Sequence, residues 1–150
     1  MTIYALNKRA TFDYELLEKL EGGLVLAGYE VKAIKTGHLS LKGAFITVHN
    51  SELYLTNAHI PAYQKANVPQ NYDEYRARKV LVRKRELASL IGKIKQKGLT
   101  LVPVKVYSKH RLIKLEFAVG KGKRKADKRE DIKKREANVN IRRALRGEKI

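Results

Sequence analysis

The chain has 150 residues, and its 33 lysines and arginines against 15 aspartates and glutamates give a formal net charge of +18. Its 43% hydrophobic content suffices for one packed domain and excludes a wholly disordered chain. Cysteine is absent, which excludes disulfides, thiolate zinc sites, iron–sulfur clusters and cysteine nucleophiles. A charge excess of this size points to a polyanionic partner.

The sequence indicates neither a membrane span nor a secretory leader. No stretch approaches the roughly 18 uncharged apolar residues that a bilayer requires. The segment from Met1 to Lys8 lacks the apolar run of a signal peptide. We therefore expect a cytoplasmic protein without a membrane partner.

Positive charge is concentrated toward the C-terminus. Residues 121–150 hold 13 lysines and arginines against 5 acidic residues, a net charge of +8. Few large aliphatic side chains are present there to offset the entropy of ordering the segment. Gly120 and Gly122 mark the change in composition. We therefore predict a folded body of residues 1–120 and a basic tail of residues 121–150 that is disordered when free.

The first third of the body predicts a helix followed by a strand. Asp13 has the side chain of an N-cap, and the pattern after it predicts a helix over Asp13–Leu20, which Gly22 and Gly23 would end. Apolar residues then recur at every second position over Leu24–Ile34, which is typical of a strand.

The middle of the body predicts a hairpin, a short strand and a second helix. Two apolar runs, Ala44–His49 and Leu53–His59, flank the turn residues Asn50-Ser51. Lys79–Arg83 alternates as a short strand. An apolar stripe at helical spacing follows and predicts an amphipathic helix that Gly98 ends. The stripe consists of Leu87, Leu90, Ile91 and Ile94.

Two long strands complete the body. Leu99–Tyr107 is rich in β-branched residues, and Pro103 within it predicts a sheet edge or a bulge. Arg111–Val119 alternates cleanly, and the loop Ser108–His110 makes the two strands a hairpin. About six strands and two helices, without regular βαβ alternation, predict a mainly β (α+β) fold built as a small antiparallel barrel. The residues expected to face its core from the last strand are Ile113, Leu115, Phe117 and Val119.

Residue types that carry catalysis are scattered. The four histidines, His38, His49, His59 and His110, share no helix-turn spacing that would chelate a metal. The sequence also lacks a P-loop and a dinucleotide-binding glycine motif. We therefore expect no enzymatic activity, no cofactor and no metal site.

Basic clusters occur throughout the body. They include Lys8-Arg9, the six lysines and arginines within residues 76–85, and Lys93, Lys95 and Lys97. Lysines and arginines near phosphates release condensed counterions, which gives sequence-independent affinity for nucleic acid. Eight tyrosines and three phenylalanines provide rings that can stack on unpaired bases. One such run alone would indicate a solvated face, but several in one small domain favour binding to nucleic acid.

Six motifs occur in order along almost the whole chain. They are Ala5-Leu-Asn-Lys-Arg-Ala10, Glu21-Gly-Gly-Leu24, Gly28-Tyr-Glu-Val-Lys32 with Gly37, Arg78-Lys79 before Arg85-Glu-Leu87, Gly120-Lys-Gly-Lys123, and Asp127-Lys-Arg-Glu-Asp-Ile-Lys133. Together they resemble the SsrA-binding protein family, the SmpB-type partners of transfer-messenger RNA.

This resemblance implies an oligonucleotide-binding-like (OB-like) antiparallel β-barrel with short flanking helices and a basic C-terminal tail. It implies a cytoplasmic role in bacterial trans-translation, in which the protein binds the tRNA-like domain of transfer-messenger RNA. Elongation factor Tu would accompany the complex to a stalled ribosome, and the protein itself would be a monomer. The tail would become helical and probe the empty mRNA channel beside the decoding centre of the small subunit.

The resemblance further implies an RNA-binding face. Glu21 and Asn7 can make directional hydrogen bonds that a lysine alone cannot specify. Leu81 has two readings, a contact with a sugar or a splayed base, or an ordinary core leucine. A charge pair at a helix end is the other reading of Glu21. The implied RNA-binding residues are Asn7, Lys8, Arg9, Glu21, Arg78, Lys79, Leu81 and Lys114.

In the tail, the motif at Asp127 matches the one that the family places near the decoding centre. The ribosome-contacting residues that the resemblance implies are Lys121, Lys123, Asp127, Lys128, Arg129, Ile132, Lys133, Lys134 and Arg135. Two alternatives remain open: a general basic RNA chaperone or ribosomal protein, and a nuclease or RNA-modifying enzyme on a barrel fold. The enzyme would require a carboxylate cluster or a cofactor loop.

Overall fold

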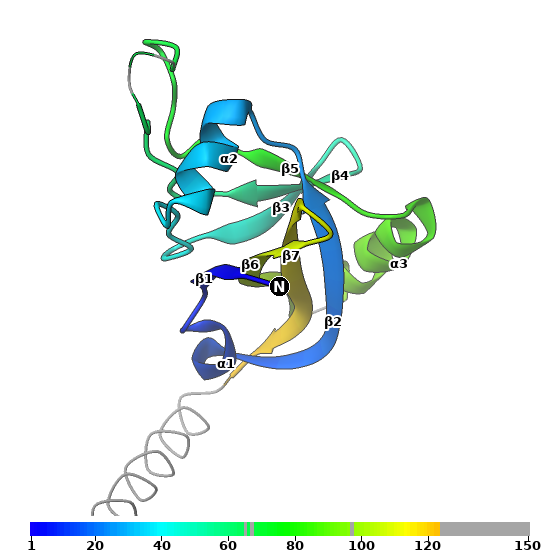
Figure 1. Cartoon of the computed structure of the whole chain (residues 1–150). Coiled ribbons are helices and arrows are strands. Elements are labelled where there is room, and N and C mark those ends of the chain that lie inside the picture. Colours follow the sequence, from blue (N-terminus) through cyan, green and yellow to red (C-terminus); the bar gives the residue numbers. More distant parts are fainter. Residues whose placement is uncertain (65, 67, 97, 124–150) are drawn as a thin grey trace, which may run out of the picture.

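The computed structural model describes residues 1–64, 66, 68–96 and 98–123, and these form one curved antiparallel sheet with three helices (Figure 1). The strands are β1 (Ile3–Leu6), β2 (Tyr14–Leu24), β3 (Phe45–His49), β4 (Glu52–Thr56), β5 (Arg78–Leu81), β6 (Leu99–Lys109) and β7 (Leu112–Gly122). The helices are α1 (Ala10–Asp13), α2 (Gly28–Lys35) and α3 (Lys84–Ile94). Neighbouring strands follow the order β1-β6-β7-β2-β5-β4-β3.

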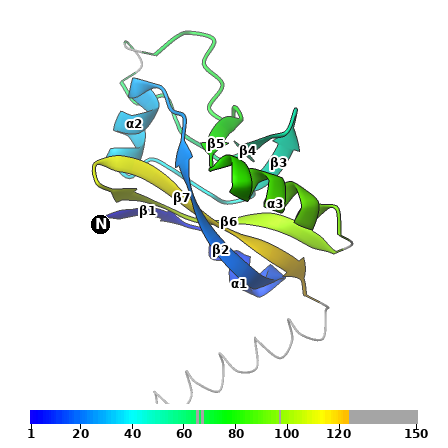
Figure 2. The same ribbon diagram turned by 90° about the vertical axis from the view of Figure 1, so that its right-hand side faces the viewer.

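The sheet curls into an open barrel. Three long strands, β2, β6 and β7, pair over most of their length and form its middle (Figure 2). β3 approaches β6 across the interior, whereas β1 and β3 are the two edges of the sheet. The predicted class, mainly β with short flanking helices, is therefore confirmed, and the barrel is left open between its edge strands.

The core fills the concave side of this sheet. Phe117 and Leu115 on β7, Val106 on β6 and Leu53 on β4 are fully buried there. Helix α3 covers one part of the core with Leu90, and α2 covers another with Ala33 and Ile34. Burial of apolar side chains from all of these elements is the main force that holds the sheet in its curled shape.

Several predicted elements are confirmed. Asn50 and Ser51 both have positive φ, as expected for the tight turn that joins β3 to β4. The short strand and the amphipathic helix correspond to β5 and α3. A shift in strand register next to Pro103 shows that this proline lies at a bulge inside the sheet. The alternating residues of the last strand face the core as predicted: Ile113, Leu115, Phe117 and Val119 are buried.

The predicted helix over Asp13–Leu20 is wrong. Only Ala10–Asp13 form a short helix, and the chain continues from Tyr14 as the long strand β2. The leucine spacing after Asp13 fits a helical stripe, but β7 lies alongside and offers a full ladder of backbone hydrogen bonds. This non-local pairing overrides the local preference, and a shift in register between Leu16 and Glu18 accommodates the sequence.

The predicted strand over Leu24–Ile34 is also wrong, because its second half is helix α2. In a helix, side chains on the same face recur about every 3.6 residues and not every second residue. Helix α2 therefore buries Glu30, Ala33 and Ile34 on one face. The Glu30 carboxylate accepts a hydrogen bond of 2.9 Å from the Ala27 N–H and caps the first turn. At the other end, Gly37 adopts a φ of +84°, which ends the helix in the left-handed conformation that glycine permits.

Gly22 leaves room for the close packing of β2 on β5. A Cβ at this position would lie 2.6 Å from Val80 Cγ1 and 3.1 Å from the Leu81 carbonyl oxygen. We expect Gly22→Ala to lower the free energy of unfolding by about 1–3 kcal/mol, since backbone and core must both shift. Urea denaturation measures this, with Gly122→Ala as the control because a Cβ there meets nothing within 4 Å. Equal stability of the two variants would contradict the packing argument.

The part of the chain that the structure describes contains no helix long and apolar enough to span a bilayer. β7 extends two residues past the predicted body boundary at residue 120, and the Lys123 N–H donates to the Asp13 carbonyl oxygen at 2.9 Å. The tail residues Asp127, Lys128, Arg129, Ile132, Lys133, Lys134 and Arg135 lie outside the described residues.

Candidate RNA-binding face

An open depression, here called the Glu21 groove, runs over the outer side of the sheet where β2, β5 and β7 meet. Its volume is about 710 Å³. Strand pairing brings its walls together, because Gly23 on β2 lies opposite both Leu81 on β5 and Lys114 on β7. The groove is lined by Glu18, Lys19, Leu20, Glu21, Gly23, Leu81, Val82, Arg83, Glu86 and Lys114.

Three residues that the resemblance implies for RNA binding therefore share one surface. Glu21, Leu81 and Lys114 lie far apart in the sequence and come from three different strands. The charges of the groove are mixed, since acidic and basic side chains both line it. A plain phosphate clamp would be uniformly basic, so this groove is suited to directional polar contacts as well as to charge attraction.

Glu21 is held in place from a neighbouring part of the sheet. Its Oε2 accepts a hydrogen bond from the Tyr107 hydroxyl and a second bond of 3.4 Å from Lys109 Nζ. The Tyr107 hydrogen bond is the main reason why the pKa of this carboxyl lies below its ordinary value, and the charges of Lys109 and Lys114 act in the same direction. Glu21 is therefore an ionised acceptor at neutral pH, and it lies within a strand rather than at a helix end.

Leu81 is a surface residue. Its exposed fraction is 51%, whereas its neighbour Val80 is buried, because successive residues of a strand face opposite sides of the sheet. The reading of Leu81 as an ordinary core leucine is therefore wrong. A second depression, of about 280 Å³, adjoins the Glu21 groove and shares Gly23, Leu81 and Lys114 with it. Leu112, which is 59% exposed, makes this second depression more apolar.

Asn7, Lys8 and Arg9 lie after β1, and none of them lines the Glu21 groove. Asn7 Nδ2 donates to the Pro103 carbonyl oxygen at 2.8 Å, and its Oδ1 accepts the Arg9 N–H at 3.2 Å. The Asn7 amide thus fastens the turn after β1 to the bulge in β6. Lys8 and Arg9 are exposed on this turn, and the Arg9 guanidinium pairs with Asp13 and lies over the Phe12 ring.

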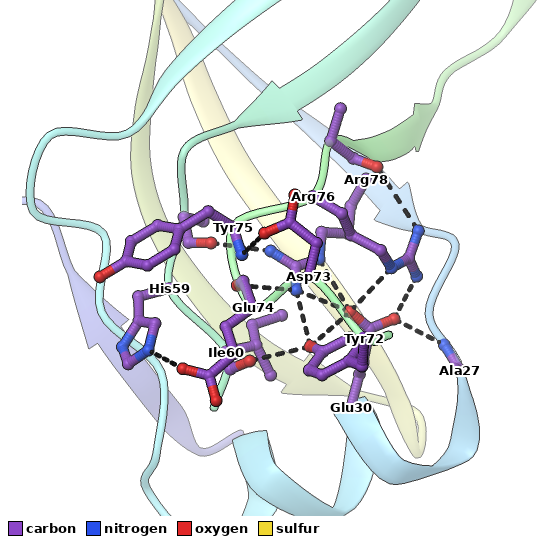
Figure 3. A network of polar contacts seen from close by, with 12 residues as sticks. Ala27, Glu30, His59, Ile60, Tyr72, Asp73, Glu74, Tyr75, Arg76 and Arg78 are labelled. Carbon is purple, nitrogen blue, oxygen red and sulfur yellow. Dashed lines mark hydrogen bonds and ion pairs between the residues drawn. The ribbon is translucent and has the colours of Figure 1, made fainter. Parts of the chain in front are cut away.

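Arg78 does not face RNA, and the expectation that it does is wrong. Its exposed fraction is 0%, as is that of Glu30. Arg78 Nε donates to Glu30 Oε2 at 2.8 Å (Figure 3). Arg78 Nη1 donates to the Ala58 carbonyl oxygen at 2.7 Å. Arginine at this position faces the core because it alternates with the exposed residues of β5. Its role is structural.

Arg78 and Glu30 are the centre of a larger polar network (Figure 3). The Tyr72 hydroxyl lies within hydrogen-bond distance of Glu30, of Arg78 and of the Ile60 carbonyl oxygen, and Arg76 also pairs with Glu30. Burial alone would raise the pKa of Glu30, but hydrogen bonds from Arg76, the Ala27 N–H and Arg78 outweigh it and lower the pKa. Burial also raises the pKa of Tyr72 to about 12.

Lys79 points to the opposite side of β5 from Arg78 and remains accessible. Its Nζ pairs with Glu52 Oε1 at 2.9 Å, and Tyr54 donates to the other oxygen of the same carboxylate at 3.0 Å. The hydrogen bond to Glu52 raises the pKa of Lys79. Of the two adjacent residues in the Arg78-Lys79 motif, Arg78 thus makes contacts in the core and Lys79 makes contacts at the surface.

Sequence reasoning missed two features of this region. The Glu30 network joins residues up to 48 positions apart, and only the charged residues inside apolar patterns, Glu30 and Arg78, could have signalled it. The pattern around Tyr107 predicts a strand and no function, and the contact of Tyr107 with Glu21 spans 86 positions. No local motif connects such residues, because the contacts depend on the sheet order.

The histidines are the remaining candidate metal ligands, and His38 and His59 contact other side chains. His59 pairs with Glu74 at 2.8 Å and stacks on Tyr75, whereas His38 stacks on Tyr63. Within the described ranges, no group of three or more histidine and acidic side chains could hold a metal ion. Of the tail residues implied to contact the ribosome, the structure describes Lys121, which is exposed, and Lys123.

Comparisons with known proteins give one consistent result. A family model described as SmpB protein matches residues 4–147. An SsrA-binding protein of Thermosipho melanesiensis is 46% identical over 148 residues, which cover 98% of this chain and 100% of that protein. One of Anoxybacillus flavithermus is 47% identical and covers 96% of this chain and 93% of its own length. A solved chain described as "tmRNA-SmpB: a journey to the center of the bacterial ribosome" has a TM-score of 0.65 and 42% identity, and the match covers 85% of this chain and 92% of that chain.

Proposed function

Because this chain belongs to the SmpB protein family, we propose that it binds the tRNA-like domain of transfer-messenger RNA and delivers it to stalled ribosomes for trans-translation. The observation that carries the proposal is the Glu21 groove, where Glu21, Leu81 and Lys114 meet on one exposed surface. The net charge of +18 supports an RNA partner independently.

The groove offers three different kinds of contact to RNA. Lys114 supplies a cation for phosphate, and exposed Leu81 supplies an apolar surface for a sugar or an unstacked base. Glu21 supplies an acceptor that hydrogen-bonds to base amino groups or 2′-hydroxyls. Phosphate contacts position the RNA without reading it, so the carboxylate is the contact that distinguishes one RNA from another.

The other partners belong to the same proposal. Elongation factor Tu would accompany the complex, and the protein would act as a cytoplasmic monomer and a binding factor without catalysis. The basic tail, residues 121–150, would enter the empty mRNA channel near the decoding centre and become helical there. Its net charge of +8 supports attraction to an RNA-lined channel, where neutralised charge offsets the entropy of ordering.

Glu21→Ala tests the specific contact. We expect this change to weaken binding to the tRNA-like domain by about 1–3 kcal/mol, the range for a hydrogen bond to a charged group, and to affect an unrelated RNA little. Lys95→Ala is the matched control, because this exposed lysine of the α3 end should weaken both RNAs alike and lower the salt slope by about 0.7–0.9. Filter binding across a salt series measures both. Equal losses for the two RNAs in the Glu21 variant would remove the assigned role of Glu21.

A further inference from the structure

Tyr107 reaches Glu21 across the strand that separates them. β7 lies between β6, which carries Tyr107, and β2, which carries Glu21. The Tyr107 side chain is almost fully buried, at 4% exposed, yet its hydroxyl donates to the exposed carboxylate. Lys105 lies over the same ring, with Nζ 5.5 Å from the ring centroid. The buried Tyr107 ring therefore places its hydroxyl group, its one polar group, at the edge of the Glu21 groove.

Both hydrogen bonds that side chains of the described residues donate to the Glu21 carboxylate end on Oε2. Oε1 is thus the oxygen that remains for a ligand in the Glu21 groove. A glutamate side chain on a surface strand has several rotamers, and fixing one of them before binding reduces the entropy lost when RNA binds. A buried residue, Tyr107, thus fixes the conformation of an exposed residue, Glu21, that is able to contact a ligand.

We propose that Tyr107 is a positioning residue for RNA recognition: its hydroxyl fixes the Glu21 carboxylate so that Oε1 accepts a hydrogen bond from an unpaired nucleotide. The inference rests on the proposed function and adds a residue to it. The ligand class follows from the acceptor. An ionised carboxylate repels phosphate and binds only donors, which on RNA are base amino or imino groups and the 2′-hydroxyl.

The charge state of Glu21 is part of this role, because a protonated carboxyl would itself become a donor and lose the selection against phosphate. The Tyr107 hydrogen bond is the largest influence on the pKa of Glu21, which it lowers. Other charged groups near the carboxylate come from three strands and from the start of α3. They are Lys109 on β6, Lys114 and Glu116 on β7, Glu18 and Lys19 on β2, and Arg83 and Glu86 at the start of α3.

Tyr107→Phe tests the inference without removing the buried ring. In a carbon-detected NMR titration of the Glu21 carboxyl, we expect the midpoint to rise toward its ordinary value in the variant, since the lowering hydrogen bond is lost. Tyr54→Phe is the matched control. It removes a tyrosine hydrogen bond to Glu52 on β4 and should shift the titration of Glu52 while that of Glu21 stays unchanged. An unchanged Glu21 midpoint in Tyr107→Phe would overturn the proposal.

RNA binding supplies the second readout. We expect Tyr107→Phe to weaken binding to the tRNA-like domain by roughly three- to tenfold, as for the net worth of one hydrogen bond, and to leave unrelated RNA unaffected. In a double-mutant cycle, adding Tyr107→Phe to Glu21→Gln should cause little further loss, because the hydroxyl acts through the carboxylate. Fully additive losses would overturn the proposal. Thermal unfolding of each variant verifies that the fold is retained.

The positioning role of Tyr107 and the proposed function are overturned by different results. A wild-type protein that prefers the tRNA-like domain, with a Tyr107→Phe variant that binds it equally well, overturns the positioning role alone. A wild-type protein without any preference for the tRNA-like domain overturns the proposed function, and the positioning role with it. Tyr54→Phe should bind both RNAs as the wild type does.

Discussion

Arg78→Met should lower the free energy of unfolding by about 3–5 kcal/mol, the range for breaking a buried ion pair by removing one partner. Glu30 would lose the bond to Arg78 Nε but remain buried, at 0% exposed. The Ala58 carbonyl oxygen would also lose the donor that Arg78 Nη1 provides. Methionine retains much of the side-chain volume, so the loss reflects the unpaired polar groups rather than a large cavity.

Chemical denaturation measures this effect, and Arg85→Met is its control. Arg85 is an exposed residue of α3, where such a change should alter stability by less than about 0.5 kcal/mol. Similar losses in the two variants would show that the buried network does not stabilise the fold. Tyr72→Phe should be intermediate, because it removes one hydroxyl from the network and leaves the ion pair intact.

The same network makes stability depend on pH. Glu30 has a lower pKa in the folded protein than its ordinary value of 4.5, because the bonds from Arg76, Ala27 and Arg78 outweigh the effect of burial. Its contribution is therefore complete above about pH 4.5 and is lost as the pH falls through the folded-state pKa. The stability difference between the wild type and Glu30→Gln should shrink as the pH is lowered through that window.

Truncation after Lys123 should abolish peptide tagging on stalled ribosomes while the body still binds the tRNA-like domain. The cut follows the end of β7 at Gly122 and keeps the Lys123 N–H that bonds to Asp13, so the described fold retains all its strands. The removed residues carry most of the basic tail, which we propose to act only on the ribosome. The measurement is tagging in a reconstituted system, beside RNA affinity of the same protein.

A point variant distinguishes a helical tail from a merely cationic one. Proline in a helix interior costs about 3 kcal/mol, so Val139→Pro should reduce tagging strongly and leave RNA binding by the body unchanged. Lys133→Arg preserves both charge and helix propensity and should be tolerated. Unimpaired tagging by Val139→Pro would mean that the tail acts as a disordered tether. Loss of RNA binding on truncation would contradict the division into body and tail.

The sequence predicted best where local rules decide the structure. Asn50-Ser51 and the stripe of α3 carry their own turn and period signals, and both elements form where expected. The helix predicted after Asp13 is wrong because this stretch pairs with β7, about 100 residues later, and the pairing overrides the helical pattern. The strand predicted over Leu24–Ile34 is wrong because the same residues also fit a helix. In that helix the buried positions are Glu30, Ala33 and Ile34.

Some residues of the candidate site could likewise be predicted from the sequence, and others could not. The resemblance to the family was sufficient to select Glu21, Leu81 and Lys114, which the sheet order then brings to one groove. It was insufficient for Arg78, because burial depends on its partner Glu30 and on the alternation of β5. Tyr107 could not be selected at all, since its hydroxyl contacts Glu21 only when β6, β7 and β2 lie side by side.

The most direct measurement is the identity of the RNA that this protein binds in cells. The protein would be cross-linked and purified, and its bound RNA sequenced, with a Glu21→Ala variant in parallel. We predict one dominant long RNA with a tRNA-like end for the wild type, and depletion of that RNA for the variant. A broad distribution of ribosomal RNA fragments, equal for the two proteins, would contradict the proposed function and indicate a general RNA chaperone.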